Sequence, residues 1–104
     1  MIQNLSMVRG DSASFNIELV NYTEDLASAY LTIRKGFEEP IIVQKSLGHG
    51  ISKIETGLYV VRIAPADTAE LVFGKYFYDV QIGTDSDVFT ILRGILQIEP
   101  DVTY

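Results

Sequence analysis

The chain of 104 residues has no cysteine, no tryptophan and one histidine, His49. Without cysteine it can form no disulfide framework, thiol nucleophile or zinc–thiolate site. A hydrolytic triad would depend on His49, which stands between two glycines and is typical of an exposed turn. Neither a Gly-x-Ser-x-Gly elbow nor a phosphate-binding glycine loop is present. We therefore expect no catalytic residue, no metal site and no cofactor, and predict that the protein is not an enzyme.

Basic residues and long apolar runs are also scarce. Lysine and arginine number 8 against 14 acidic residues, which gives a formal net charge of −6, and they are dispersed along the chain. Nucleic-acid binding needs a basic face that displaces counterions, so it is not expected. No apolar run approaches the length of a membrane span, and residues 1–6 do not read as a signal peptide. The sequence therefore predicts neither nucleic-acid nor membrane partners.

The residues that are present fit one domain over residues 1–104, because the length suits one domain and 47% of the residues are hydrophobic. Apolar and polar side chains alternate, most clearly in residues 13–19, which is the pattern of half-buried strands. Further strands are predicted at residues 2–8, 29–35, 41–47, 51–55, 58–63, 75–83 and 88–98, with a helical turn in residues 65–71. The predicted fold is all-β: an immunoglobulin-like antiparallel β-sandwich of about seven strands with one short helical turn.

One aromatic residue narrows the choice among all-β architectures. Tyr76 follows the turn at Gly74 and opens the strand predicted at residues 75–83. Immunoglobulin-like sandwiches carry a tyrosine at this point, and its hydroxyl bonds back to the backbone of the preceding segment. We interpret Tyr76 as this tyrosine corner. The alternative is that Tyr76 is one more aromatic residue of the core.

The outward side chains of three predicted strands are unusually apolar. If Tyr76 faces inward, the alternation turns Phe77 outward, and the neighbouring strands follow the same rule. Aromatic residues and arginine are enriched at protein interfaces, so we predict self-association or docking on a larger assembly. The predicted interface residues are Tyr30, Arg34, Phe77, Phe89, Ile91, Arg93 and Ile95. The alternative is a bulge near Gly94 that reverses the alternation and buries half of the last strand.

Two ligand-binding alternatives stay open. The carboxylates of Asp79, Asp85 and Asp87 could hold a calcium ion, but Asp-Ser-Asp is also a common composition of a solvated turn. Exposed aromatic rings could stack on sugars, which makes a carbohydrate- or cell-surface-binding module the alternative function. The aromatic residues concerned are Tyr22, Tyr30, Phe37 and Phe77.

Several segments together match a recurrent pattern. They are Met7-Val8-Arg9-Gly10-Asp11, residues 64–76, Tyr78-Asp79-Val80-Gln81-Ile82, Thr90-Ile91-Leu92-Arg93-Gly94 and residues 98–103. The pattern resembles the small β-sandwich proteins encoded among tail and structural genes of tailed bacteriophages and prophages. It is similar in particular to the N-terminal domain of baseplate upper proteins. The resemblance covers most of the chain, is weakest in residues 36–50, and rests on structural motifs that carry no catalytic residue.

The resemblance implies a non-enzymatic structural protein of a phage or prophage tail, baseplate or virion, acting through protein–protein contacts. Its partners would be other phage structural proteins, and a homo-oligomer is one expected form. The implied location is the virion, assembled in the cytoplasm of the bacterial host. Baseplate proteins carry receptor-binding parts in a long downstream region, whereas this sequence ends near Tyr104. We therefore expect an accessory or connector module rather than direct recognition of the host.

Overall fold

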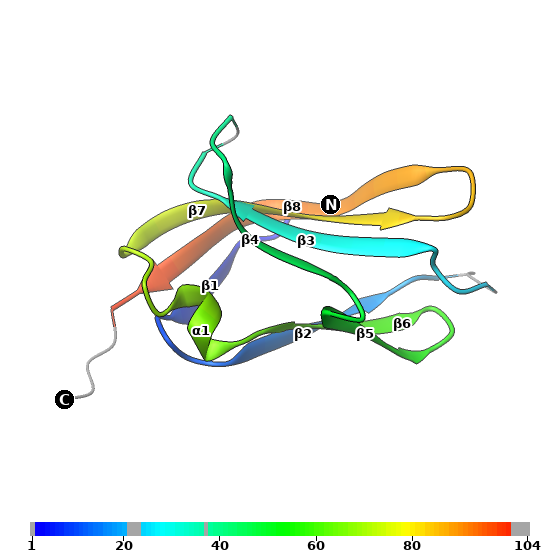
Figure 1. Cartoon of the computed structure of the whole chain (residues 1–104), viewed down its shortest axis with the longest axis horizontal. Helices are drawn as coiled ribbons and strands as arrows, with labels where there is room; N and C mark the ends of the chain where they lie inside the picture. Colours follow the sequence, from blue (N-terminus) through cyan, green and yellow to red (C-terminus); the bar gives the residue numbers. More distant parts are fainter. Residues whose placement is uncertain (1, 21–23, 37, 101–104) are drawn as a thin grey trace.

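Strands form almost all of the regular structure of the chain. The computed structural model describes residues 2–20, 24–36 and 38–100 (Figure 1). The strands are β1 (Leu5–Val8), β2 (Ala13–Glu18), β3 (Ser28–Arg34), β4 (Ile41–Leu47), β5 (Gly50–Glu55), β6 (Leu58–Ile63), β7 (Gly74–Gly83) and β8 (Val88–Glu99), and the helix α1 is Pro65–Thr68. The prediction of an all-β chain with one helical turn is confirmed, with eight strands rather than about seven. Within the described residues, no helix is long and apolar enough to cross a membrane.

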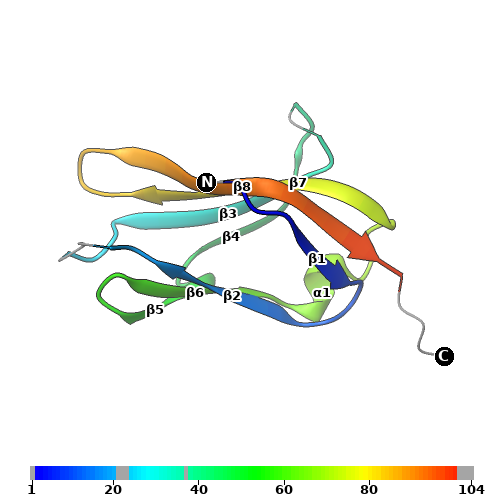
Figure 2. The same cartoon turned by 180° about the vertical axis from the view of Figure 1, so that it is seen from behind.

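The eight strands are hydrogen-bonded in the order β1-β8-β7-β3-β4-β5-β6-β2. Figures 1 and 2 show β3, β7 and β8 on one side of the molecule and β2, β5 and β6 on the other, with β4 running from the first side to the second. The sheet is mixed rather than antiparallel, because β1 pairs with β8 in parallel and β4 meets the start of β5 in parallel at two positions. Gly48 and His49 join β4 to β5, and the start of β5 runs in the same direction as the end of β4.

The buried core lies between these two sides and is built from alternate positions along the strands. Alternate residues of two strands are buried: Tyr76, Tyr78, Val80 and Ile82 on β7, and Tyr59, Val61 and Ile63 on β6. The hydroxyl oxygen of Tyr59 accepts a hydrogen bond from the N–H of Leu26 at 3.0 Å, which satisfies a polar group inside the core. The alternation of apolar and polar residues is therefore sufficient to identify the buried face of these two strands.

The alternation of β8 changes phase along the strand. Leu92 lies opposite Val80 of β7, whereas Thr90 lies opposite the next residue, Gln81. Ile91 is therefore the extra residue of a β-bulge. The anticipated alternative of a bulge in this strand is present, but it lies three residues before Gly94.

The bulge corrects the predicted orientation of the first part of β8. Strict alternation from the buried Leu92 would turn Val88 and Thr90 inward, but both are exposed. Phe89, expected outward, lies opposite the buried Ile82 and so on the core side of the sheet. A single inserted residue reverses which side chains share a face, because the side-chain period of a strand is two.

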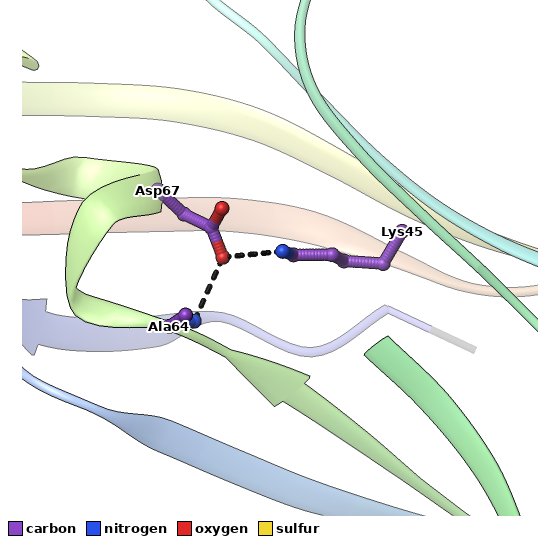
Figure 3. Close-up of polar contacts among 3 residues, drawn as sticks. All are labelled: Lys45, Ala64 and Asp67. Atoms are coloured by element: carbon purple, nitrogen blue, oxygen red, sulfur yellow. Dashed lines mark hydrogen bonds and ion pairs between the residues drawn. The ribbon is translucent and has the colours of Figure 1, made fainter. Parts of the chain in front are cut away.

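Polar side chains fix the crossing segment between β6 and β7. The carboxylate of Asp67 accepts a hydrogen bond from the N–H of Ala64 at 2.7 Å and lies 2.7 Å from the Nζ of Lys45 on β4 (Figure 3). Asp67, at the third position of α1, thereby closes the first turn of the helix and ties it to a strand. The buried hydroxyl oxygen of Thr68 accepts a hydrogen bond from the N–H of Gly10 at 2.9 Å. This second bond joins α1 to the turn between β1 and β2.

Tyr76 closes the crossing segment at the start of β7. Its hydroxyl donates a hydrogen bond to the carbonyl oxygen of Val72 at 2.8 Å, four residues upstream. The ring is 2% exposed, and the Nζ of Lys35 lies 4.4 Å from its centroid. This backbone bond is the one expected of a tyrosine corner.

Replacing Tyr76 with phenylalanine isolates the contribution of this hydrogen bond. The Tyr76→Phe variant keeps the buried ring and its contact with Lys35, so we expect a loss of about 1 kcal/mol in the free energy of unfolding. Tyr30→Phe, at a 40% exposed ring, is the matched control and should change stability by less than about 0.5 kcal/mol. Urea denaturation followed by far-UV circular dichroism measures both. Equal stability of the two variants would contradict a structural role for the Tyr76 hydroxyl.

Candidate functional site

A hollow of about 640 Å³ lies on the face of β3, β7 and β8 that points away from the core. We call this face the outer face. The hollow is lined by Ile2, Asn4, Thr32, Arg34, Phe77, Tyr78, Asp79, Thr90, Arg93, Gly94 and Ile95. Its volume falls within the range of small-ligand and side-chain binding pockets.

The strand register builds the floor of the hollow from two rows of directly opposed residues. Read from β3 through β7 to β8, the rows are Arg34, Phe77 and Ile95, then Thr32, Asp79 and Arg93. Directly opposed side chains on one face of a sheet lie roughly 5 Å apart. Arg34 and Arg93 therefore stand diagonally across β7, with Phe77 and Asp79 between them.

The charged groups of the hollow form no ion pair with the other described residues. Lys45 and Lys53 each have an aspartate oxygen within 2.7 Å. Within the part of the chain that the structure describes, Arg34, Arg93 and Asp79 form no ion pair. Two guanidinium groups and one carboxylate give the hollow a net charge of +1, in a chain of net charge −6.

The Nε atom of Arg34 is buried and has no hydrogen-bond partner. It is the one such side-chain atom among the described residues. A buried donor without a partner costs about 1–3 kcal/mol. The guanidinium groups of Arg34 and Arg93 line the hollow. The hollow can therefore bind a group that accepts hydrogen bonds, and an anionic acceptor suits its net charge best.

The N-terminal segment forms one wall of the hollow. Ile2 forms a parallel bridge with Arg93, whose carbonyl oxygen accepts a hydrogen bond from the N–H of Gln3 at 2.9 Å. The side-chain oxygen of Asn4 accepts a hydrogen bond from the N–H of Ile95 at 3.1 Å. The sequence prediction includes none of these wall residues, because the pairing joins positions about 90 residues apart in the chain.

Gly94 permits this close approach of the N-terminal segment. A Cβ atom at position 94 would lie 2.0 Å from the carbonyl oxygen of Gln3. The same oxygen accepts a hydrogen bond from the hydroxyl of the buried Tyr78. A glycine inside a strand often marks close backbone contact, and this was the available signal in the sequence.

The structure brings together four of the seven predicted interface residues. Arg34, Phe77, Arg93 and Ile95 all line the hollow. Tyr30 lies on the same face one row further along, opposite Gln81, and is 40% exposed. Ile91 instead packs against the core, and Phe89 lies opposite Ile82 on the core side. The bulge in β8 therefore removes these two residues from the outer face.

The remaining sequence candidates do not form a second site. His49 is exposed in the bend between β4 and β5, and Asp85 and Asp87 are exposed in the β7–β8 turn. Over residues 2–20, 24–36 and 38–100, no group of three acidic or histidine side chains is placed to hold a metal ion. Of the aromatic residues considered for sugar stacking, Tyr22 and Phe37 lie outside the described residues.

Comparisons with known proteins show a likeness in structure only. No protein-family model and no curated protein sequence matches the chain. A family 123 glycoside hydrolase from Clostridium perfringens, which acts on glycolipid glycans, has 11% sequence identity and a TM-score of 0.53. The similarity covers 97% of this chain but only 23% of the hydrolase, so the chain spans about a quarter of that protein.

A second solved structure matches over nearly the full length of both chains. It is the extracellular domain of the voltage-gated sodium channel β4 subunit, which forms parallel homodimers and has a role in cell–cell adhesion. Sequence identity is 10%, the TM-score is 0.50, and the match covers 97% of this chain and 93% of that domain. At these identities both likenesses concern the fold alone.

The buried hydroxyl of Tyr78 predicts an alkaline limit to stability. Burial raises the pKa of Tyr78 above its ordinary value of 10.0. Because the folded-state pKa is the higher one, the contribution to stability is complete below pH 10 and is lost as the pH rises through the folded-state value. Urea denaturation midpoints should be steady from about pH 8 to pH 10 and fall above that. Tyr78→Phe should be less stable at neutral pH but show a shallower alkaline decline, and an equally steep decline would contradict the assignment.

Proposed function

We propose that the chain is a non-enzymatic, immunoglobulin-like β-sandwich module that assembles with further copies of itself through the outer face. The observation that carries this proposal is the hollow, where two guanidinium groups that form no ion pair with any described residue stand beside the half-buried Phe77 and Ile95. Arginine and aromatic residues in a concave site are typical of interface anchors. A second copy is a suitable partner, because a surface of net charge −6 offers carboxylates to a hollow of net charge +1.

The immunoglobulin-like part of the proposal is supported by strand order and by Tyr76. The strands β8, β7, β3 and β4 follow one another as the G, F, C and C′ strands of a variable-type domain do, and β2, β6 and β5 follow as B, E and D. The bond from Tyr76 to Val72 lies at the start of the strand that corresponds to F. The nearly complete overlap with the sodium channel β4 domain is consistent with such a sandwich.

The phage or prophage setting rests on the sequence resemblance alone. In that setting, the module is a structural protein of the tail, baseplate or virion, and its other partners are neighbouring structural proteins. Many copies held close together would make a modest interface sufficient, since the effective concentration between linked sites is far above that in solution.

Charge reversal on the outer face tests the proposed self-association. We expect the weight-average mass of the wild-type chain to rise above 11.6 kDa with concentration in sedimentation equilibrium. Arg93→Glu should weaken the association at least about tenfold, because it places a carboxylate beside Asp79. Arg62→Glu, at an exposed position on β6, is the control and should associate like the wild type. A wild-type mass of 11.6 kDa at every concentration, or equal weakening by both variants, would contradict the proposal.

A carbohydrate-binding module is the second candidate function. The ring of Phe77 and the hydrogen-bonding groups of Asn4, Arg34 and Asp79 line the same hollow, and such a mixture also suits a saccharide. A glycan screen separates the two candidates. Specific, saturable binding that Arg34→Gln abolishes would favour the carbohydrate function, and no binding across the screen would favour self-assembly.

A further inference from the structure

The turn between β7 and β8 presents acidic and apolar side chains that are complementary to those of the hollow. We call residues 85–89 the hairpin tip. Asp85 and Asp87 are exposed, and the next two residues, Val88 and Phe89, are 70% and 46% exposed. The hairpin tip thus combines carboxylates with neighbouring apolar side chains. The hollow combines guanidinium groups with neighbouring apolar side chains, so the two surfaces match in charge and in polarity.

The hairpin tip has a defined shape. The N–H of Thr84 donates a hydrogen bond to the carbonyl oxygen of Asp87 at 2.8 Å, and the Thr84 hydroxyl oxygen accepts one from the N–H of Asp87 at 3.2 Å. These bonds close the turn and hold both aspartates at one end of the molecule, where Figures 1 and 2 show the β7–β8 hairpin. A preformed turn loses little conformational freedom on binding, which favours it as an inserting element.

The hairpin tip cannot occupy the hollow of its own chain. Both lie on β7 and β8, and Asp87 is seven residues from Gly94 along the extended strand, a span of roughly 24 Å. The two strands stay paired over this span on both sides of the bulge at Ile91, so the hairpin does not fold back onto its own outer face. Any contact between hairpin tip and hollow therefore joins two copies of the chain.

We propose that the hairpin tip of one copy docks into the hollow of the next, with Asp85 and Asp87 against Arg34 and Arg93. This inference rests on the proposed function, self-association through the outer face, and names the surface that the outer face binds. The guanidinium group of Arg34 then gains a carboxylate partner, and Val88 and Phe89 cover apolar side chains of the hollow.

Docking of this kind is heterologous, since the two contacting surfaces differ. Each copy uses its hairpin tip on one neighbour and its hollow on another. Heterologous contacts form rings or open chains rather than closed dimers. The arrangement therefore predicts masses that continue to grow with concentration beyond the dimer.

Mixing two variants tests the docking directly. The tip variant carries Asp85→Lys and Asp87→Lys, and the hollow variant carries Arg34→Gln and Arg93→Gln. Each variant alone should associate at least about tenfold more weakly than the wild type. An equimolar mixture should form a 1:1 heterodimer of about twice 11.6 kDa and no larger species, because one intact tip then meets one intact hollow.

The first control, Glu18→Lys with Glu55→Lys, carries the charge change of the tip variant at exposed positions of β2 and β5, on the other side of the molecule. The second, Arg62→Gln, removes one positive charge at an exposed position of β6. Both should assemble like the wild type, and thermal melts should show that every variant is folded. A wild-type chain that assembles while the mixture stays monomeric, or a tip variant that assembles normally, overturns the docking and leaves the proposed self-association standing. A wild-type chain that stays monomeric overturns both.

Discussion

Strand β7 is hydrogen-bonded on both sides, and the arrangement of the core and of the hollow depends on this pairing. It pairs with β8 over its ten residues and with β3 over seven. Its alternate side chains supply four buried residues to the core, while Phe77 and Asp79 face outward between Arg34 and Arg93. One strand register therefore sets both the packing of the core and the arrangement of the charged side chains in the hollow. A slip of one residue would exchange the two faces, so the burial of the core also fixes the position of the charges.

The N-terminal segment completes the site that this register begins. It crosses beside Gly94, where a side chain would collide with the carbonyl oxygen of Gln3, and it brings Ile2 and Asn4 to the edge of the hollow. The Tyr78 hydroxyl anchors the same carbonyl group from the core side. The wall of the hollow is thus tied to the core, which keeps the site preorganised rather than dependent on a free end of the chain.

Local patterns in the sequence are sufficient for most of the fold but not for the geometry of the site. Alternation identifies the inward faces of β6 and β7, and the position of Tyr76 after a turn predicts its bond to the backbone. The phase of β8 is not predictable in this way, because the bulge at Ile91 is visible only against the register of β7. Phe89 and Ile91 therefore leave the expected interface. The long-range pairing of residues 2–4 with β8 has no local signal except Gly94.

The central claim is that the hollow on the outer face is the surface through which the chains contact one another. Nuclear magnetic resonance of the arginine side chains tests this claim most directly. The Nε–H signal of Arg34 should shift as the protein concentration rises through the range in which the mass increases, because a carboxylate then binds the same guanidinium group. The Nε–H signal of Arg62, exposed on β6, should stay in place. An Arg34 signal that does not move while the chains assemble would contradict the account, because assembly would then use a different surface.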